Sequence, residues 1–249
     1  EAINTAFSPT SDLLPVRYRY SKQFKQIKQM EDAQLFFSIQ PQENQKAESY
    51  TLKIEQEKIE IQAQDQAGLF YAFVTLDQLI EDAVNSNTPL PLVTLQDETK
   101  IAFRPIQIDV KHHLEKKSYY YDLIDALAQL KINGIILEIE DKLKYKRRPE
   151  VASADALSIG EWRALSTYAL ARNISISPLV QGLGHASFIL KHDKNKHLRD
   201  DPKSDWAFNP LNPETYVLQY DLYLDAMEAF PHGKYLHVGG DEVQTTGRG

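Results

Sequence analysis

The sequence predicts an α/β protein in which a small α+β domain precedes the first four βα units of a (β/α)8 barrel. Two observations support this class. Residues 50–63 alternate between apolar and polar side chains around a short turn and lead into a run with helical spacing, a pattern typical of a hairpin packed against a helix. From residue 101, short apolar runs alternate with amphipathic runs, which indicates a parallel sheet with helical crossovers. We therefore predict domains over residues 1–100 and 101–249.

The first domain should contain a strand at Leu35–Ile39 and a hairpin of two strands at 50–54 and 59–63. In the hairpin, every second residue is apolar, as expected for strands with one buried face. Asp65 then has the position and chemistry of a helix N-cap, and apolar residues at helical spacing continue to about residue 83. We expect residues 85–91 to be a linker.

The second domain should contain four strands, at residues 106–110, 135–139, 174–180 and 235–238. Three amphipathic helices are predicted between them. The second helix opens with a capping box at Ser158 and Glu161, and the third opens with Asn212 as cap before Pro213. The apolar stripe expected for the third helix consists of Tyr220, Tyr223, Leu224, Met227 and Phe230.

Polar side chains gather where these four strands end. Ligand-binding groups of parallel α/β folds lie at the carboxyl ends of the strands, so side chains from all four units should face one rim. The candidates are Asp109 and His112 after the first strand, Glu138, Glu140 and Asp141 at the second, His185 after the third, and His237, Asp241 and Glu242 at the fourth. Glu138 and Glu140 are expected to share a strand face.

The acid pair Asp241 and Glu242 is the centre of this set. Neighbouring residues of a regular strand point to opposite faces, but Gly239 and Gly240 precede the pair and permit backbone conformations that other residues avoid. The strand tip can therefore curl and present both carboxylates to one site. The alternative interpretation is an ordinary solvated surface turn.

Composition excludes several classes of protein. The net charge is −7, and no long Lys/Arg-rich run is present, so we expect no nucleic-acid partner. No apolar run approaches the roughly 20 residues of a membrane span, and the lack of cysteine excludes disulfides and cysteine-bound zinc. The basic run at 142–148 is interpreted as a solvated loop. A metal site of His, Asp and Glu is conceivable, although no HExxH-type spacing supports it, and we expect no metal.

Together, these motifs resemble a known family. The segment His237-Val238-Gly239-Gly240-Asp241-Glu242 is similar to the acid motif of the family-20 glycoside hydrolases, the β-N-acetylhexosaminidases. Residues 48–80 resemble the small α+β domain that precedes many of their barrels. Residues 133–141 and 178–185 look most like the hexosaminidase D-like branch. The resemblance covers roughly residues 48–249 and rests on ordered motifs rather than on any one of them.

The resemblance implies a retaining hydrolysis in which the substrate's own acetamide attacks the anomeric carbon. Asp241 would orient the acetamide, and Glu242 would act as general acid and then base. A general acid needs a pKa near the working pH, so Glu242 is expected to be partly desolvated or to lie beside another anion. His185 would support the acid together with Asp141 or Glu140.

The sugar itself would be bound by Asp109, His112, Glu138 and His237. The substrates would be glycans ending in N-acetylglucosamine or N-acetylgalactosamine, with no cofactor. Two departures bear on sugar recognition: His112 occupies the place of an arginine that binds sugar hydroxyls in many members, and Leu137-Glu138 replaces their Trp-His. The hexosaminidase D-like branch shares such changes and tends to accept N-acetylgalactosamine, so galacto substrates are included.

A complete barrel takes ~250 residues, so we expect this chain to be a fragment with little or no activity alone. It would associate with the other half-barrel or with a second copy, and a periplasmic or secreted setting would suit glycan degradation. Three alternatives stay open: a barrel that only binds glycans, a metal-dependent hydrolase using His112, His185 and an acid, and an assembly module.

Overall fold

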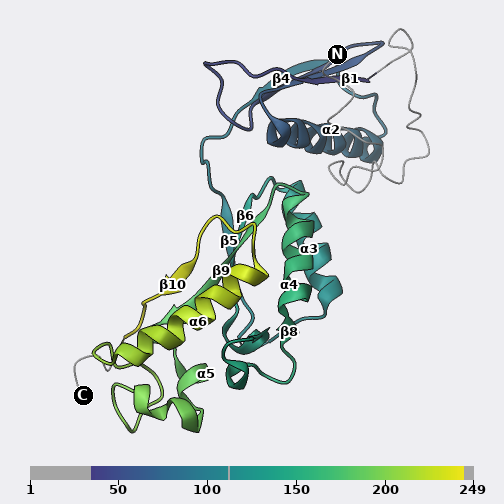
Figure 1. The fold of residues 1–249 in the computed structure, drawn as a ribbon. Helices are drawn as coiled ribbons and strands as arrows, with labels where there is room; N and C mark the ends of the chain where they lie inside the picture. The colour runs from purple at the N-terminus through teal and green to yellow at the C-terminus, as the bar shows by residue number, and fades with distance from the viewer. Residues whose placement is uncertain (1–34, 112, 244–249) are drawn as a thin grey trace. The chain divides into compact units, whose positions relative to one another are not determined.

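The computed structural model describes residues 35–111 and 113–243 (Figure 1), and these fall into two compact units. The first unit is the described part of Glu1–Arg104 with two short segments, Asp125–Ile132 and Ala171–Asn173. The second unit contains the remaining described residues, from Pro105 onward. The candidate site residues all belong to the second unit.

The first unit is built on a four-stranded sheet of β1 (Leu35–Ile39), β2 (Tyr50–Ile54), β3 (Ile59–Ala63) and β4 (Val93–Asp97), in the order β1-β3-β2-β4. β2 runs antiparallel to β3 and β4, whereas β1 is parallel to β3. The predicted first strand and hairpin are confirmed. β4 was missed, although its alternating apolar residues carry the ordinary signal of a half-buried strand.

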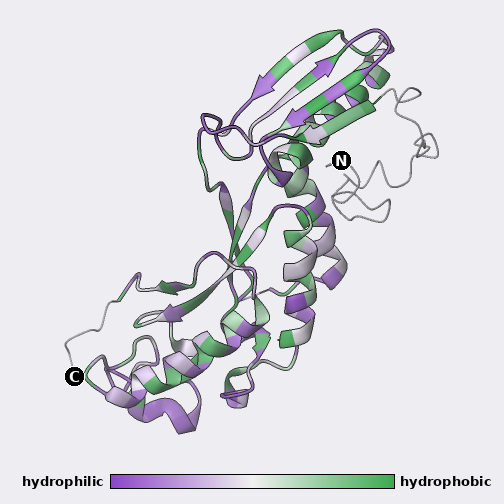
Figure 2. Ribbon diagram, turned by 45° about the horizontal axis from the view of Figure 1, so that its top comes forward, coloured by the Kyte–Doolittle hydropathy of each residue, from purple (hydrophilic) through white to green (hydrophobic). Residues whose placement is uncertain are grey.

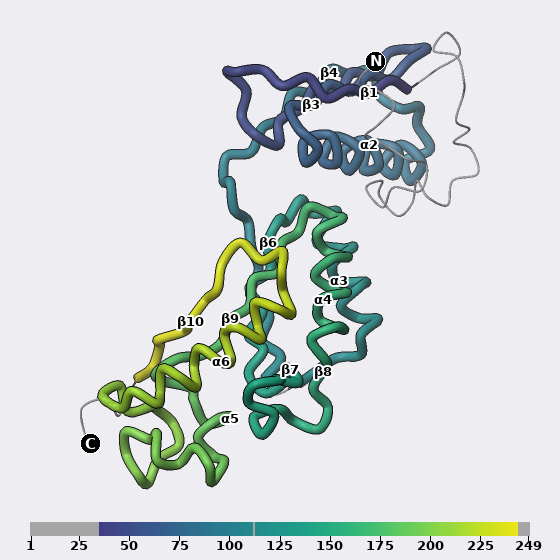
Figure 3. Tube along the Cα trace, viewed as in Figure 1, coloured from purple at the N-terminus to yellow at the C-terminus, as the bar shows by residue number. Residues whose placement is uncertain are grey.

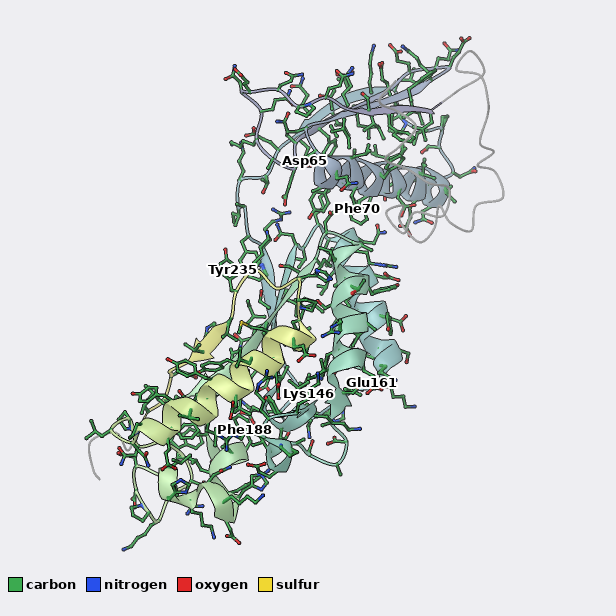
Figure 4. The ribbon with its side chains drawn as sticks, in the orientation of Figure 1. Asp65, Phe70, Lys146, Glu161, Phe188 and Tyr235 are labelled. Carbon is green, nitrogen blue, oxygen red and sulfur yellow. The ribbon has the colours of Figure 1, made fainter. Side chains whose placement is uncertain are left out.

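Helix α2 (Gln66–Ser86) packs against one face of this sheet. The Asp65 carboxylate accepts hydrogen bonds from the backbone N–H of Gly68 at 2.7 Å and of Glu48 at 2.9 Å, so the predicted N-cap is confirmed. Hydrophobic residues recur along the helix (Figure 2), and Phe70 (Figure 4) is among those that are buried. The helix extends to Ser86, so the region predicted as a linker begins later than expected.

The second unit contains a parallel sheet of β5 (Pro105–Asp109), β6 (Gly134–Glu138), β9 (Ser175–Gly182) and β10 (His237–Gly239), ordered β10-β9-β6-β5. Every pairing in this sheet is parallel. All four predicted strands are confirmed, with ends that differ by up to two residues. β9 is buried along its whole length and forms the core of the sheet.

Three longer helices follow β5, β6 and β9, as the alternating pattern predicts: α3 (Lys117–Gln129), α4 (Ile159–Leu170) and α6 (Pro213–Ala229). The capping box of α4 is confirmed, because Glu161 accepts from the backbone N–H of Ser158 at 2.9 Å and donates its own N–H to the Ser158 hydroxyl at 3.2 Å. α4 and α6 pack against each other and against β9 (Figure 3). Shorter elements are η2 (Glu140–Lys142), β7 (Leu143–Lys144), η3 (Pro149–Val151), β8 (Leu157–Ser158), α5 (Ser187–Leu190) and η4 (Asp193–Leu198).

The apolar stripe predicted for α6 is wrong for three of its five residues, whereas Phe230 is buried as predicted and Tyr223 is half-buried. Tyr220, Leu224 and Met227 are 62%, 46% and 45% exposed, whereas the helix buries the set Thr215, Leu218, Gln219, Leu222, Asp225, Ala226 and Ala229. Apolar residues occur on more than one side of α6, so periodicity alone did not identify the inward face. The helix turns its smaller side chains inward, where α4 and β9 contact it.

The basic run at 142–148 is a solvated loop only in part, because Lys144, Lys146 and Arg147 are exposed and Lys142 is buried. Lys142 is buried and lies 3.3 Å from Asp141 and 3.1 Å from Asp155. Asp225, on the buried face of α6, pairs with Arg147 and accepts from the backbone N–H of Lys146 at 2.7 Å. Lys142 and Arg147 therefore pair with Asp141 and Asp225, whose side chains are 13% and 0% exposed, and spacing in the sequence does not reveal this burial. Among the described residues, no helix is both long and apolar enough to cross a membrane.

Candidate active site

The strands of the second unit end at one common rim. In the sheet register, Asp109 of β5 faces Glu138 of β6, Glu138 faces Leu179 of β9, and Gly182 of β9 faces Gly239 of β10. The side chains and loops that follow these ends therefore come from neighbouring strands. This is the edge at which parallel α/β sheets place their ligands.

The acid pair follows β10 through a curled backbone. Gly239 and Gly240 have φ angles of +67° and +100°, and Glu242 itself has a φ of +48°. A side chain at Gly239 would place its Cβ 1.9 Å from the Gln181 amide oxygen and 3.1 Å from the Gln181 Cα, so the Gln181 side chain would have to move in addition to the conformational strain. The side chains of Asp241 and Glu242 are 61% and 64% exposed among the described residues. Glu242 therefore has an anion beside it, Asp241, as one of the two expectations required. The other expectation, that Glu242 is partly desolvated, does not hold in the described residues.

His185 lies between the two acids. Its Nε2 is 3.3 Å from Asp241 Oδ2 and 3.3 Å from Glu242 Oε2. Neither contact has the geometry of a hydrogen bond, and each is an ion pair only when the imidazole is protonated. The His185 side chain is only 16% exposed. The preceding Gly184 permits this approach, because a Cβ there would lie 2.7 Å from the Asp241 carbonyl oxygen. The structure therefore brings together the three residues at the centre of the predicted site.

A second cluster of charges occupies the β5 and β6 ends of the rim. The buried Glu138 carboxylate accepts from Gln181 Nε2 at 2.9 Å and from Lys111 Nζ at 3.3 Å, and Lys111 also pairs with Asp109 at 2.9 Å. Burial lowers the pKa of Lys111, but the hydrogen bond to Asp109 and the charge of Glu138 outweigh it, so that the pKa is raised. Gln181 connects this cluster to the turn at Gly239.

Glu140 and Asp141 lie beyond the end of β6. Glu140 does not continue the strand face of Glu138, because it begins the 3-10 turn η2 with a φ of +36°, and its carbonyl accepts from the Tyr145 hydroxyl at 2.8 Å. Burial raises the pKa of Glu140 to about 8, and the charge of Lys111 offsets this only in part. Asp141 lies 3.3 Å from Lys142. Within the described residues, neither acid forms a hydrogen bond or ion pair with His185.

Of the two histidines expected to bind the sugar, the structure describes only His237. His237 is exposed, and its Nδ1 accepts from the backbone N–H of Gly239 at 3.0 Å, which helps to shape the turn before the acids. His112 lies outside the described residues. In the part of the chain that the structure describes, no group of three His, Cys, Asp or Glu residues is placed to hold a metal ion.

Two residues of this rim were not selected from the sequence. Lys111 could have been found, because it directly follows the predicted strand at 106–110 and lies near acids that need a cation. Trp206 contacts His185, with ring centroids 4.5 Å apart, and its Nε1 donates to the Glu242 carbonyl oxygen at 2.8 Å. It lies in an irregular segment with no periodicity, so only the folded chain places it at the site.

Comparison with known proteins identifies the family of this chain. Residues 9–98 match the family model described as glycosyl hydrolase family 20, domain 2, and residues 101–247 match that of the glycosyl hydrolase family 20 catalytic domain. The chain is 31% identical over 147 residues to hexosaminidase D of Bos taurus, covering 59% of this chain and 42% of that protein. It is 26% identical over 221 residues to a β-N-acetylhexosaminidase of Cellulomonas fimi, covering 80% of this chain and 44% of that protein.

Solved structures show the same fold. A chitobiase of Flavobacterium johnsoniae matches with a TM-score of 0.78 at 24% identity, covering 95% of this chain and 40% of that one. A β-N-acetylhexosaminidase of Bacteroides fragilis matches with a TM-score of 0.78 at 21% identity, covering 97% and 52%. The chain thus spans about half the length, or less, of these relatives, and its parallel sheet corresponds to the first four βα units of a (β/α)8 barrel. On the evidence of both matching domains, this chain belongs to glycosyl hydrolase family 20.

Proposed function

We propose that the protein carrying this chain is an exo-acting β-N-acetylhexosaminidase that removes terminal N-acetylglucosamine or N-acetylgalactosamine from glycans. The observation that carries the proposal is the convergence of His185 on Asp241 and Glu242, each 3.3 Å from its Nε2. Membership of family 20 supports the reaction class, and the two carboxylates beside His185 support the choice of Asp241 and Glu242 as the acid pair.

In the proposed reaction, the acetamide oxygen of the substrate attacks the anomeric carbon while the carboxylic acid of Glu242 protonates the departing glycosidic oxygen. The C–O bond to the leaving group breaks, and a cyclic oxazolinium ion forms. Asp241 orients the acetamide and stabilises the positive charge on its nitrogen. The Glu242 carboxylate then takes a proton from water, which attacks the anomeric carbon, and the acetamide re-forms with retained configuration.

The cluster of Asp109, Lys111 and Glu138 is proposed to bind the sugar's hydroxyl groups. Glu138 and Asp109 supply acceptors and Lys111 supplies a donor, so the cluster can recognise groups that both donate and accept. Its position on strands β5 and β6 of the same sheet supports a role in binding the sugar ring. We include His112 and His237 as further sugar-binding residues, as the resemblance implies.

The acetamide is the feature of the substrate that tests this mechanism. We expect hydrolysis of 4-nitrophenyl N-acetyl-β-D-glucosaminide or the corresponding galactosaminide, and none of 4-nitrophenyl β-D-glucoside. Replacing the acetyl group by fluoroacetyl, difluoroacetyl and trifluoroacetyl groups should lower kcat progressively, because fluorine withdraws electrons from the attacking oxygen. A kcat that does not depend on fluorination would contradict substrate assistance, and sugar binding without turnover would favour a barrel that only binds glycans.

We further propose that the 249-residue chain has little or no activity alone and that turnover needs the length of its relatives. Such barrels contain eight strands, and the described residues supply four. Association with the other half-barrel or with a second copy would complete the sugar pocket. Comparing turnover by the 249-residue chain with turnover by a chain of relatives' length tests this, and equal rates would contradict it.

A further inference from the structure

We propose that Trp206 is a positioning residue that holds both the general acid Glu242 and its neighbour His185 in place. This inference rests on the proposed function for the identity of the acid, but its structural part stands on its own contacts. Trp206 lies at the rim and is partly buried. It is one of only two tryptophans in the chain, and neither the acid motif nor the helical pattern includes it.

The backbone around the acids is strained at positions that do not carry glycine. Leu183, His185 and Glu242 have φ angles of +66°, +51° and +48°. The left-handed conformation is unfavourable for a residue with a side chain, so it persists only where surrounding contacts determine it. The loops that carry His185 and Glu242 therefore need specific partners.

Those partners come from one short segment, residues 206–208. The Phe208 N–H donates to the Leu183 carbonyl at 2.8 Å, the Ala186 N–H donates to the Trp206 carbonyl at 2.9 Å, and the Trp206 indole N–H donates to the Glu242 carbonyl at 2.8 Å. The first two bonds bracket His185, and the third fixes Glu242 itself. The net contribution of such a hydrogen bond to stability is of the same order as the conformational cost that it offsets.

Residues 206–208 are themselves held in place by burial and by backbone hydrogen bonds. Phe208 is fully buried, the Asp200 N–H donates to the Ala207 carbonyl at 3.0 Å, and the Asn209 N–H donates to the Leu198 carbonyl at 2.7 Å. The indole ring of Trp206 also packs on the His185 imidazole, with centroids 4.5 Å apart and planes inclined by 53°. One side chain thus contacts the histidine with its ring face and the acid's backbone with its N–H.

Tryptophan is the side chain that can make both contacts. Phenylalanine in this position would keep the ring packing on His185 but would lose the donor to Glu242. Trp162 offers a matched control, because it is buried on α4, its Nε1 donates to the Lys142 carbonyl at 3.0 Å, and its ring contacts are with Tyr120 and Phe230. Substituting either tryptophan by phenylalanine removes one indole N–H bond to a carbonyl.

The structural test uses the 249-residue chain and needs no turnover. We expect the His185 imidazole to quench the emission of the indole ring that it contacts. His185→Gln should therefore raise the tryptophan emission of the wild type and of Trp162→Phe and leave that of Trp206→Phe unchanged. Amide hydrogen exchange at residues 183–186 and 239–243 should become at least several-fold faster in Trp206→Phe, and unchanged exchange at 239–243 would overturn the proposal.

The kinetic test uses the protein of relatives' length with 4-nitrophenyl N-acetyl-β-D-glucosaminide. Misplacing a catalytic group lowers the rate of chemistry more than it weakens binding, so Trp206→Phe should lower kcat about tenfold with KM unchanged within about twofold. Trp162→Phe should lower the thermal midpoint but not kcat. A kcat retained in Trp206→Phe would overturn the positioning role. Turnover that survives Glu242→Gln would instead contradict the proposed function. The contacts of Trp206 with His185 and Glu242 would then be tested by the fluorescence and exchange measurements alone.

Discussion

Lys111 places its ammonium group 3.3 Å from the buried carboxylate of Glu138, and it is the cation that balances the acids at this end of the rim. Asp109 shares this cation at 2.9 Å. The arrangement matters for stability as well as for sugar binding. The Glu138 side chain is only 4% exposed, so water cannot replace Lys111 as the partner of its carboxylate.

Replacing Lys111 by methionine should therefore destabilise the protein by about 3 kcal/mol at pH 7, the cost of leaving a buried charge without its partner. Lys117→Met is the matched control, since Lys117 pairs with Glu161 at 2.8 Å but is 52% exposed. The control should cost less than about 1 kcal/mol. Urea unfolding of the three proteins measures this, and equal midpoints for the two variants would contradict the role given to Lys111.

The stability of the protein should depend on pH through Glu140. Its folded-state pKa of about 8 lies above its ordinary value of 4.5. The contribution of the protonated Glu140 to the free energy of unfolding is therefore fully present below about pH 4.5 and is lost as the pH rises through 8. Glu140→Gln removes an ionisable group, and the variant should gain roughly 2–4 kcal/mol relative to wild type between pH 5 and pH 9. Urea unfolding across that range provides the measurement.

Glu161→Gln is the control of opposite sign. The hydrogen bond from Lys117, with those from Ser158, lowers the pKa of Glu161 to about 2, so its stabilising effect is present above about pH 4.5 and is lost only as the pH falls toward 2. This variant should be less stable than wild type at pH 7, and the difference should shrink in acid. A Glu140→Gln variant whose relative stability is constant with pH would show that Glu140 does not titrate as described.

Glycine substitutions should separate contact from backbone strain in the turn before the acids. Gly239→Ala suffers both, because its φ is +67° and the new Cβ would meet Gln181 at 1.9 Å, whereas Gly240→Ala at φ +100° meets no atom within 4 Å. We expect Gly240→Ala to cost about 1–2 kcal/mol and Gly239→Ala to cost more.

The control is Gly160→Ala within α4, where the nearest atom lies 4.0 Å from the new Cβ. It should stabilise the protein by about 0.4–1 kcal/mol. Thermal unfolding of the three variants gives the ranking. Equal effects of Gly239→Ala and Gly240→Ala would mean that Gln181 moves away without cost.

The sequence predicted those parts of the fold that depend on local pattern. The hairpin, the Asp65 cap, the capping box of α4 and the four parallel strands each follow from spacing or from side-chain chemistry within a few residues. The inward face of α6 could not be predicted in this way. Its apolar residues surround the helix, and the choice between faces depends on which side chains fit against α4 and β9.

The same distinction applies to the candidate site. Asp241, Glu242 and His185 were selected because they follow strand ends, and the parallel register brings them together. The burial of Glu140 and the ion pairs of the run at 142–148 depend on contacts between segments far apart in sequence. Trp206 reaches the acid from a loop 36 residues away, a distance over which no sequence pattern operates.

The central claim is that Glu242 transfers the proton to and from the glycosidic oxygen, and kcat of its glutamine variant tests it most directly. In the protein of relatives' length, Glu242→Gln should lower kcat for an aryl N-acetyl-β-D-hexosaminide by about 10²–10⁴-fold, while the exposed control Glu214→Gln on α6 should retain it. A Glu242→Gln enzyme that keeps wild-type kcat would contradict the account, whatever the positions of Asp241 and His185.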